Sequence, residues 1–463
     1  MSATAATARI ANAGELAGRG MAELRELALR VAGAGLAACD VGLATEGAVA
    51  AQNDAVEIAG RAYPLAEDAR VIVLGSGKAT LAIAAALERR LGARVDAGAV
   101  VVRDGEDTIE LERIEVLLAD HPLPSERSIA GARRLAELAA DARAGDLVLA
   151  SFTGGSSALT SLPPPGVSGA DKRRLHELLL SSGAPITEVN AVRKHVSALK
   201  GGRLAAGIAP ATLVNLTASD VAGDVLDAIT DPTVQDGSTV ADAVAILRER
   251  ELWDALPDSV RDHLATPAAE SPRLEREPHT VVLVTGRSAC EAMVLEAERA
   301  GADARVVSTG LEGEARELGG MLAGMARAEP DGDSARTLPR VLVGCGGEAT
   351  VALGGDGAFG AGGPNQEAAL AAALALAEGV PIAACFLDTD GSDGGTAAAG
   401  AIVDGHTAGR ATGAGLDLEA ALASHRSGDA LAELGDRVLT GPTQTNVNDL
   451  FVIAIGHAEG GSS

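Results

Sequence analysis

Residues 71–79 read Val-Ile-Val-Leu-Gly-Ser-Gly-Lys-Ala and constrain the fold more than any other part of the chain. The four branched aliphatic residues predict a strand that is buried on both faces. A Gly-Ser-Gly turn follows, and Lys78 then stands at the start of a helix rich in Ala, Leu and Ile. Backbone N–H groups at such a helix start, together with an ammonium group, form an anion site. The alternative interpretation is an ordinary tight turn with an exposed lysine.

The turn matches neither of the two common nucleotide-binding motifs. It is not a P-loop, because no glycine stands five residues before Gly77 and Ala79 occupies the position of the magnesium-binding Ser or Thr. The third glycine of a dinucleotide fingerprint is also absent, since Thr80 and Leu81 fill that stretch. We therefore expect an anion-binding turn of another family.

Strands and helices alternate through the first half of the chain. Apolar runs at 97–103, 114–119, 147–152 and 213–217 predict further strands, with helices between them. The run at 147–152 ends in a second glycine-rich turn, 153–157. This order predicts a parallel, doubly wound α/β sheet, in which ligands bind beyond the carboxyl ends of the strands.

The length of 463 residues exceeds what one hydrophobic core usually supports, which predicts two domains. We place an N-terminal Rossmann-like domain at 1–275 and a C-terminal α/β domain at 276–463. Residues 8–60 look helical, and the charged, proline-rich stretch 254–279 looks like a linker. The last third repeats the order of strand followed by a Gly/Asp-rich turn.

Composition narrows the classes of partner. A net charge of −26 argues against nucleic acid and anionic membranes, which both require a cationic surface. The four cysteines form no Cys-x-x-Cys pair, so we expect buried, reduced thiols and a cytoplasmic protein. We expect neither a signal peptide nor a membrane span.

The scarcity of lysine, with four in the whole chain, draws attention to Lys78 and to a basic run. This run contains Arg193, Lys194, Lys200 and Arg203, and suits an anionic substrate or nucleotide phosphates; a solvated helix face is the alternative. Carboxylates in or beside glycine turns are plausible for Mg²⁺ or for activating a hydroxyl, although Asp in such places often only shapes the turn. They are Asp220, Asp224, Glu348, Asp390 and Asp393.

Eight segments between residues 71 and 455 together resemble the glycerate 2-kinase family, ATP-dependent kinases that phosphorylate the 2-hydroxyl of D-glycerate. The segments are 75–79, 121–124, 153–159, 190–205, 219–224, 346–351, 389–394 and 440–450. The resemblance implies two α/β domains with the active site in the cleft between them. It also implies ATP and Mg²⁺ as cofactors and a small anionic sugar acid as substrate, with a homodimer as the candidate assembly.

The resemblance assigns roles to particular residues. The implied catalytic residues are Lys78, Asp220, Glu348, Asp390 and Asn446, of which Asp220, Glu348 and Asp390 would hold Mg²⁺. The implied substrate- and phosphate-binding residues are Gly75, Gly77, Gly155, Ser156, Ser157, Asn190, Arg193, Lys200 and Arg203. His121 looks structural, and His195 is a slightly better candidate for the site.

Two positions depart from the family pattern. Pro364 stands where the family usually has arginine, and Asp231 stands where it usually has glycine. Either change predicts an altered substrate or a lower rate. Two other interpretations stay open, an NAD(P)H-dependent hydroxypyruvate reductase and a non-catalytic ligand-binding paralogue.

Overall fold

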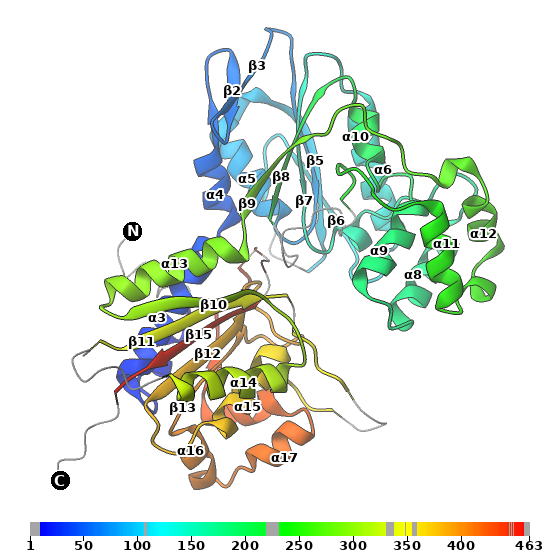
Figure 1. Ribbon diagram of the computed structural model, residues 1–463. Coiled ribbons are helices and arrows are strands. Elements are labelled where there is room, and N and C mark those ends of the chain that lie inside the picture. The colour runs from blue at the N-terminus through cyan, green and yellow to red at the C-terminus, as the bar shows by residue number, and fades with distance from the viewer. Residues whose placement is uncertain are drawn as a thin grey trace, which may run out of the picture. The chain divides into compact units, whose positions relative to one another are not determined.

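The structure is a computed structural model that describes residues 10–105, 109–218, 231–329, 338–347, 349–353, 359–443, 445, 447 and 449–457. The chain forms two compact units. Unit 1 comprises Met1–Asp40 and Val284–Ser463, and unit 2 comprises Val41–Leu283. Each unit contains a six-stranded sheet, drawn in Figure 1.

Unit 2 is built on a sheet with the strand order β6-β5-β4-β7-β8-β9. The pairs β4–β5, β4–β7, β5–β6 and β7–β8 are all parallel. The strand bounds are β4 Val71–Ser76, β5 Val95–Arg103, β6 Glu115–Ala119, β7 Leu147–Phe152, β8 Thr212–Ala218 and β9 His279–Val284. Chain order reverses between β4 and β7, so their carboxyl ends form the switch point at which such sheets bind ligands.

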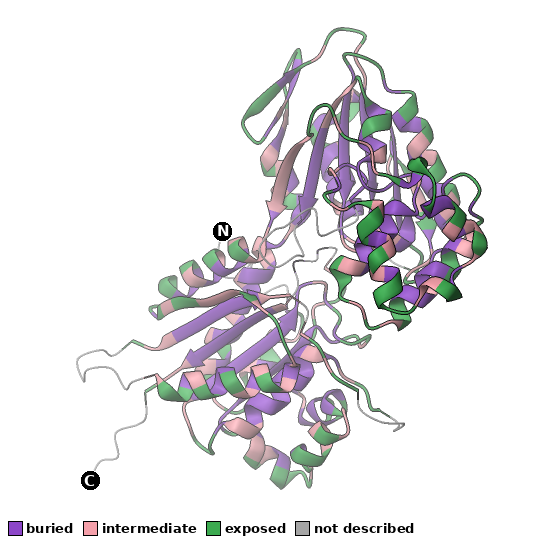
Figure 2. Ribbon diagram, turned by 45° about the vertical axis from the view of Figure 1, so that its right-hand side comes forward, coloured by how far each residue is buried: buried purple, intermediate pink, exposed green. Residues whose placement is uncertain are grey.

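Helices cover both faces of this sheet, which confirms the doubly wound fold. Helix α5 packs against β4, β5 and β7, whereas α6 packs against β4, β5, β6 and α10. The helices and short 3-10 turns of unit 2 are α4 Val41–Ala48, α5 Thr80–Leu91, η1 Gly92–Arg94, α6 Glu126–Ala140, α7 Ser156–Leu159, α8 Gly169–Ser181, α9 Ile186–His195, α10 Arg203–Ile208, α11 Val240–Glu249, η4 Trp253–Ala255, α12 Asp258–Leu264 and η5 Pro267–Ala269. Figure 2 shows buried strands between helices whose outer faces are exposed.

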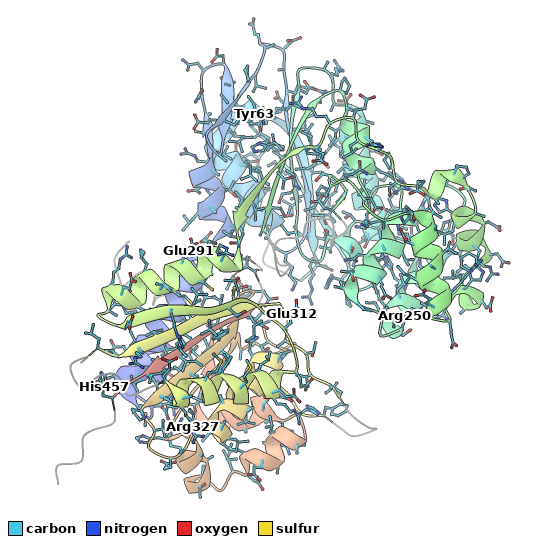
Figure 3. The ribbon with its side chains drawn as sticks, in the orientation of Figure 1. Tyr63, Arg250, Glu291, Glu312, Arg327 and His457 are labelled. Atoms are coloured by element: carbon cyan, nitrogen blue, oxygen red, sulfur yellow. The ribbon has the colours of Figure 1, made fainter. Side chains whose placement is uncertain are left out.

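Helices α8, α9, α11 and α12 form a hydrophobic core of their own beside the sheet. Val192 and Leu247 are fully buried within it. Arg250, labelled in Figure 3, ties α11 to α9 through a two-pronged ion pair with Glu188. Helix α9, which carries Arg193, is therefore held from several sides.

Unit 1 has a mixed sheet with the order β10-β11-β15-β12-β13-β14. Among the strand pairs that its described residues form, only β10–β11 is parallel, and β15 runs antiparallel between β11 and β12. The strand bounds are β10 Asp303–Leu311, β11 Arg340–Gly346, β12 Ile382–Asp388, β13 Gly400–Asp404, β14 Arg437–Val438 and β15 Asp449–Ile455. The helices are α2 Ala13–Ala17, α3 Ala22–Ala38, α13 Gly286–Arg299, α14 Ala315–Ala328, α15 Pro364–Ala375, α16 Thr407–Gly413, α17 Leu418–Ala423 and α18 Ser427–Leu434.

The N-terminal helices belong to this second sheet. Helix α3 packs on β15, β12 and α13, and its residue Arg25 is fully buried. The Arg25 guanidinium donates to Asp404 Oδ2 at 2.9 Å and to Asp436 Oδ1 at 2.6 Å, and also to the carbonyls of Leu16 and Ile402. Although burial opposes ionisation, the Arg25 charge and backbone donors hold the pKa of Asp404 below its usual value.

The structure differs from the sequence-based division in three places. Described residues 10–40 pack with the C-terminal unit rather than with the N-terminal domain, and the boundary falls at 283/284 rather than 275/276. The expected helix over 8–60 ends early, because β1 Val49–Ala51, β2 Ala55–Ile58 and β3 Arg61–Pro64 form an antiparallel sheet. The expected linker contains α12, and its end is anchored where the Tyr63 hydroxyl bonds His279 Nδ1; Tyr63 is labelled in Figure 3.

Candidate anion site at the carboxyl ends of β4 and β7

Two glycine-rich turns follow β4 and β7 and are bonded to each other. The N–H of Thr153 donates to the carbonyl of Ser76 at 3.0 Å, and the N–H of Lys78 donates to the carbonyl of Gly154 at 2.9 Å. The Thr153 hydroxyl oxygen accepts a bond from the N–H of Ala79 at 3.1 Å. The pair of turns is therefore one rigid structure at the switch point of the sheet.

Close packing explains the glycines in the first turn. A Cβ at Gly75 would lie 2.7 Å from the carbonyl oxygen of Ser151. Gly77 has φ +125°, and a Cβ there would lie 2.4 Å from the Thr153 hydroxyl. Neither contact leaves room for a side chain, so both glycines are needed for the two turns to meet.

The second turn brings Lys78 and His121 together at Gly155. Gly155 has φ +85° and caps α7, which begins with Ser156 and Ser157. A Cβ built on Gly155 would lie 3.5 Å from His121 Nε2 and 3.8 Å from Lys78 Cγ. Burial, and then the charges of Lys78, Arg103 and Arg193, lower the pKa of His121, which favours the neutral form of its ring.

Two buried cations lie behind this edge. Lys200 is fully buried, and its ammonium has no hydrogen-bond partner within the described part of the chain. Burial and the neighbouring Arg193 charge lower the pKa of Lys200 to about 7, opposed by Asp231. Arg193 is 9% exposed, its Nε has no partner among the described residues, and burial lowers its pKa to about 10. Buried charges are ordinarily paired, so this pair is suited to an external anion.

Sequence reasoning missed three further basic side chains, those of Lys172, His176 and Arg103, around Lys200 and His121. Lys172 is buried and donates from Nζ to the carbonyls of Leu162 and Val196. Burial, and then the charges of Lys200, Arg203 and Arg193, hold the pKa of Lys172 well below its usual value. His176 is similarly depressed in pKa, by burial and by Arg193 and Lys172. The rarity of lysine was the available signal for Lys172, whereas nothing local marked His176 or Arg103.

Other members of the basic run are occupied within the fold. Arg203 donates to the carbonyls of Lys194, Lys200, Ala269 and Glu270, which fixes the loop after η5. Lys194 Nζ pairs with Asp236 Oδ1 at 2.6 Å. His195 is fully buried, with Nδ1 against the carbonyl of Ala269 and Nε2 against Ser238 Oγ. Asn190 is buried on α9, one turn before Arg193, whose Nη1 donates to its Oδ1 at 3.4 Å.

Some of the predicted catalytic and metal-binding residues lie in the described part of the chain, and the others lie outside it. Asp220, Asp224, Glu348 and Asn446 lie outside the described residues, so their assigned roles stay predictions. Asp390 follows β12 in unit 1, where its Oδ1 accepts bonds from the N–H and hydroxyl of Ser392. The residues that the structure describes contain no group of three or more His, Cys, Asp or Glu side chains placed to hold a metal ion.

Asp393 has a structural role. Its two carboxylate oxygens accept bonds from the N–H groups of Asn365 and Gln366, in the first turn of α15. Burial raises the pKa of Asp393, and the bonds from Gln366 and Asn365 oppose that rise. The amino end of α15 is therefore already satisfied by a carboxylate.

Pro364 and Asp231, the two residues that depart from the family pattern, both lie in the described part of the chain. Pro364 is the first residue of α15, a position that needs no N–H donor and suits the fixed φ of proline. Asp231 is buried and accepts bonds from Asn215 Nδ2 and from the N–H and hydroxyl of Thr233. Burial raises the pKa of Asp231, while these bonds and Lys200 oppose the rise. Asp231 therefore acts as a partial counter-ion to Lys200.

Comparison with known proteins gives the family. Residues 27–265 match the family described as Domain of unknown function (DUF4147), and residues 341–449 match the MOFRL family. The chain is 41% identical to a glycerate 2-kinase of Pyrococcus horikoshii over 372 residues, covering 79% of this chain and 83% of the relative. It is 42% identical to a putative hydroxypyruvate reductase of Agrobacterium vitis over 364 residues, covering 78% and 82%.

A solved structure supports the same assignment. The crystal structure of a glycerate kinase from Thermotoga maritima superposes with a TM-score of 0.81 at 34% identity, covering 94% of this chain and 99% of that one. This confirms the resemblance that the eight segments indicated and the two α/β units that it implied. The chain therefore belongs to the glycerate 2-kinase family of phosphotransferases.

Proposed function

We propose that the protein transfers the terminal phosphoryl group of ATP to the 2-hydroxyl of D-glycerate or a closely related small sugar acid, with Mg²⁺. The observation that carries the proposal is a pair of buried cations with unsatisfied donors: within the described part of the chain, Lys200 Nζ and Arg193 Nε have no hydrogen-bond partner. In a chain of net charge −26, such a site suits a small anion captured by local groups. The relatives named as glycerate kinases indicate which sugar acid to expect as the substrate.

The chain's own groups fit phosphoryl transfer. This reaction depends on positioning and on cations placed around the moving phosphoryl group, rather than on covalent chemistry by the protein. Lys78 stands at the amino end of α5 beside the open Gly155 turn, where an ammonium can hold a phosphate or a carboxylate. Arg193 and Lys200 add positive charge behind this turn, in a desolvated setting where charge acts strongly.

Magnesium belongs to the same proposal. Mg²⁺ usually binds through one or two carboxylates and substrate phosphates, so it does not require a preformed cluster of protein ligands. Asp390 is the described candidate ligand, with Asp220 and Glu348 predicted beside it. A shared site in a cleft between the two domains, a homodimer and a cytoplasmic location also remain proposals. The four cysteines fit that location, since all of them are described, buried and outside any disulfide.

The membrane criterion gives a limited result. Among the described residues, no single helix has both the length and the apolar character to cross a membrane. Taken together, helices α3 and α4 have the length and apolar composition of a membrane span, but the chain bends at the break between them. Arg25, in α3, is buried inside unit 1 against Asp404 and Asp436.

One observation favours the reductase interpretation: the similar proteins from Agrobacterium vitis are named putative hydroxypyruvate reductases. Against it, the third fingerprint glycine is missing, and Thr80 in that region donates its hydroxyl to the carbonyl of Ser151. A single experiment separates the interpretations. Purified protein is given ATP, Mg²⁺ and a panel of three- and four-carbon sugar acids while ADP release is measured, and in parallel NAD(P)H with hydroxypyruvate while absorbance is followed.

The expected result is ADP release that requires a sugar acid, with D-glycerate among the accepted substrates. NAD(P)H oxidation without ADP release would replace the kinase with the reductase. Ligand binding without either reaction would identify a non-catalytic paralogue.

A further inference from the structure

One cavity of unit 2 lies outside the turns just discussed. Its volume is about 440 Å³, and it is enclosed by the loop after β6 and by the first turns of α6 and α8. Cavities of about 300–1,000 Å³ hold drug-sized ligands. A nucleoside is of that size, whereas a three-carbon acid is smaller. We propose that this cavity holds the nucleoside part of the phosphoryl donor, an inference that rests on the proposed function.

The walls present both donors and acceptors of hydrogen bonds. Helices α6 and α8 have 15 and 13 residues, and both point their amino ends at the cavity through Glu126–Ile129 and Gly169–Arg173. The capping Ser125 and Ser168 already accept from the third N–H of each helix, whereas the first two N–H groups have no acceptor within their own helix and can donate to base nitrogens. The carboxylates of Asp120 and Glu126 line the same cavity and can accept from ribose hydroxyls.

A buried hydroxyl gives independent evidence for a ligand. Ser161 lines the cavity and is 1% exposed, yet its Oγ has no hydrogen-bond partner in the described part of the chain. Buried polar groups are nearly always paired, so an unpaired one needs an explanation. A bound polar ligand that accepts from or donates to Ser161 supplies it.

Two residues of the cavity wall connect it to the groups of the anion site. Asp120 in its wall is followed by His121, whose ring approaches Gly155 and Lys78. Lys172 in its wall belongs to the buried cations around Lys200, because its pKa responds to both Lys200 and Arg193. A nucleoside in the cavity therefore places its phosphates on the side where Lys78 and Arg193 are found.

The test fills the cavity without touching the anion site. Ala170→Trp introduces a large ring from the exposed first turn of α8, and Leu180→Trp introduces the same ring on α8 at an exposed residue that does not line the cavity. Dissociation constants for ADP and for D-glycerate are measured by calorimetry, and KM for ATP and D-glycerate by ADP release. We expect Ala170→Trp to weaken ADP at least tenfold and D-glycerate less than twofold, and Leu180→Trp to change neither.

Ser161→Ala covers the possibility that Ala170→Trp does not fold. Because the hydroxyl has no partner in the fold, we expect unchanged or higher thermal stability together with ADP binding weaker by roughly three- to tenfold. A merely structural serine would not separate the two readouts in this way.

Other outcomes overturn the assignment. Unchanged ADP binding in both folded variants, or a larger loss for D-glycerate than for ADP, shows that the cavity is not the nucleoside site. Failure of the proposed function would appear separately, as a wild-type protein that phosphorylates no sugar acid. If the wild-type protein is an active kinase and neither Ala170→Trp nor Ser161→Ala changes its KM for ATP, the proposed function stands and only the assignment of the cavity is wrong.

Discussion

Both units bury positive charge, and they treat it in opposite ways. In unit 1, fully buried Arg25 meets two carboxylates and two carbonyls. In unit 2, fully buried Lys200 has no hydrogen-bond partner among the described residues, and nearby Arg193 is only weakly bonded to Asn190. A buried charge whose donors are satisfied holds a fold together, whereas one left unsatisfied destabilises the fold and is expected to serve a ligand.

The largest expected effect comes from replacing Arg25, the buried cation whose hydrogen bonds are made within unit 1. Arg25→Met leaves Asp404 and Asp436 buried without their shared cation, and loss of one partner from a buried pair costs about 3–5 kcal/mol. We expect a matching loss of free energy of unfolding in urea, with unit 1 affected first. Arg30→Met is the control, since Arg30 on the same helix is 30% exposed and pairs with Glu296 only. Equal stability of the two variants would show that the Arg25 network is not an anchor.

The second effect concerns catalysis at the turn between β4 and α5. Lys78→Met should lower kcat by about 10²-fold or more and leave thermal stability nearly unchanged, because it removes an ammonium from the site where phosphoryl charge develops. Steady-state ADP release and a thermal melt measure the two quantities. Lys78→Arg is the matched control, which keeps the charge but not its compact shape. Near wild-type turnover by Lys78→Met would remove Lys78 from the mechanism.

Lys200→Met should separate stability from binding. Replacing an unpaired buried ammonium by an apolar chain of similar length should raise the free energy of unfolding by about 1–2 kcal/mol near pH 7. The same change should raise KM for the anionic substrate or for ATP roughly tenfold, because a charge-assisted bond is lost. Lower stability of the variant would mean that Lys200 is part of the fold rather than held for a ligand.

The pH dependence of the same pair of proteins gives a sharper check. The pKa of Lys200 is about 7 in the folded protein, below the value of about 10.4 in an unfolded chain. Between these values the unfolded state binds more protons, so the Lys200 contribution to stability rises with pH from about 7 to about 10. We expect Lys200→Met to reduce this slope in urea titrations without bound ligand. Identical slopes would place the Lys200 pKa near its ordinary value.

The smallest effect tests the satisfied end of α15. Pro364→Arg adds an arginine beside a small cavity of about 30 Å³ that Asn365 and Asp449 also line. The loss of a favourable first-turn proline should cost up to about 1 kcal/mol. We expect kcat/KM for D-glycerate to rise by up to about tenfold relative to four-carbon acids, since a guanidinium grips carboxylates and phosphates bidentately. Pro364→Gln controls for loss of the proline alone. No change in substrate preference would show that the departure at this position is neutral.

The sequence predicted the parts of the fold that depend on local pattern. The buried run before Gly75 did become β4, and the second turn did follow β7, because apolar runs and glycine turns act over short distances. The expected helix over 8–60 was wrong beyond residue 48, since residues 49–64 pair as three short strands whose pattern is weak in isolation. Nothing in the order of residues near Arg25 indicated its partners, because Asp404 and Asp436 lie 379 and 411 positions away in the chain.

The site shows the same division. Sequence alone predicted two glycine-rich turns at the carboxyl ends of strands, one of them beside Lys78, because apolar runs followed by glycines are local patterns. The close contacts that require glycine at Gly75 and Gly77 come from Ser151 and Thr153, which the tertiary structure brings to them. The sequence also supplied the basic run, but it could not distinguish Arg203 and Lys194, which bond within the fold, from Arg193 and Lys200, which the fold leaves unsatisfied. Only the tertiary structure decided that difference, since burial and partners come from segments distant in the chain. The physical reason is that a charge acquires its role from the groups that surround it, and the packing of the whole unit determines those groups.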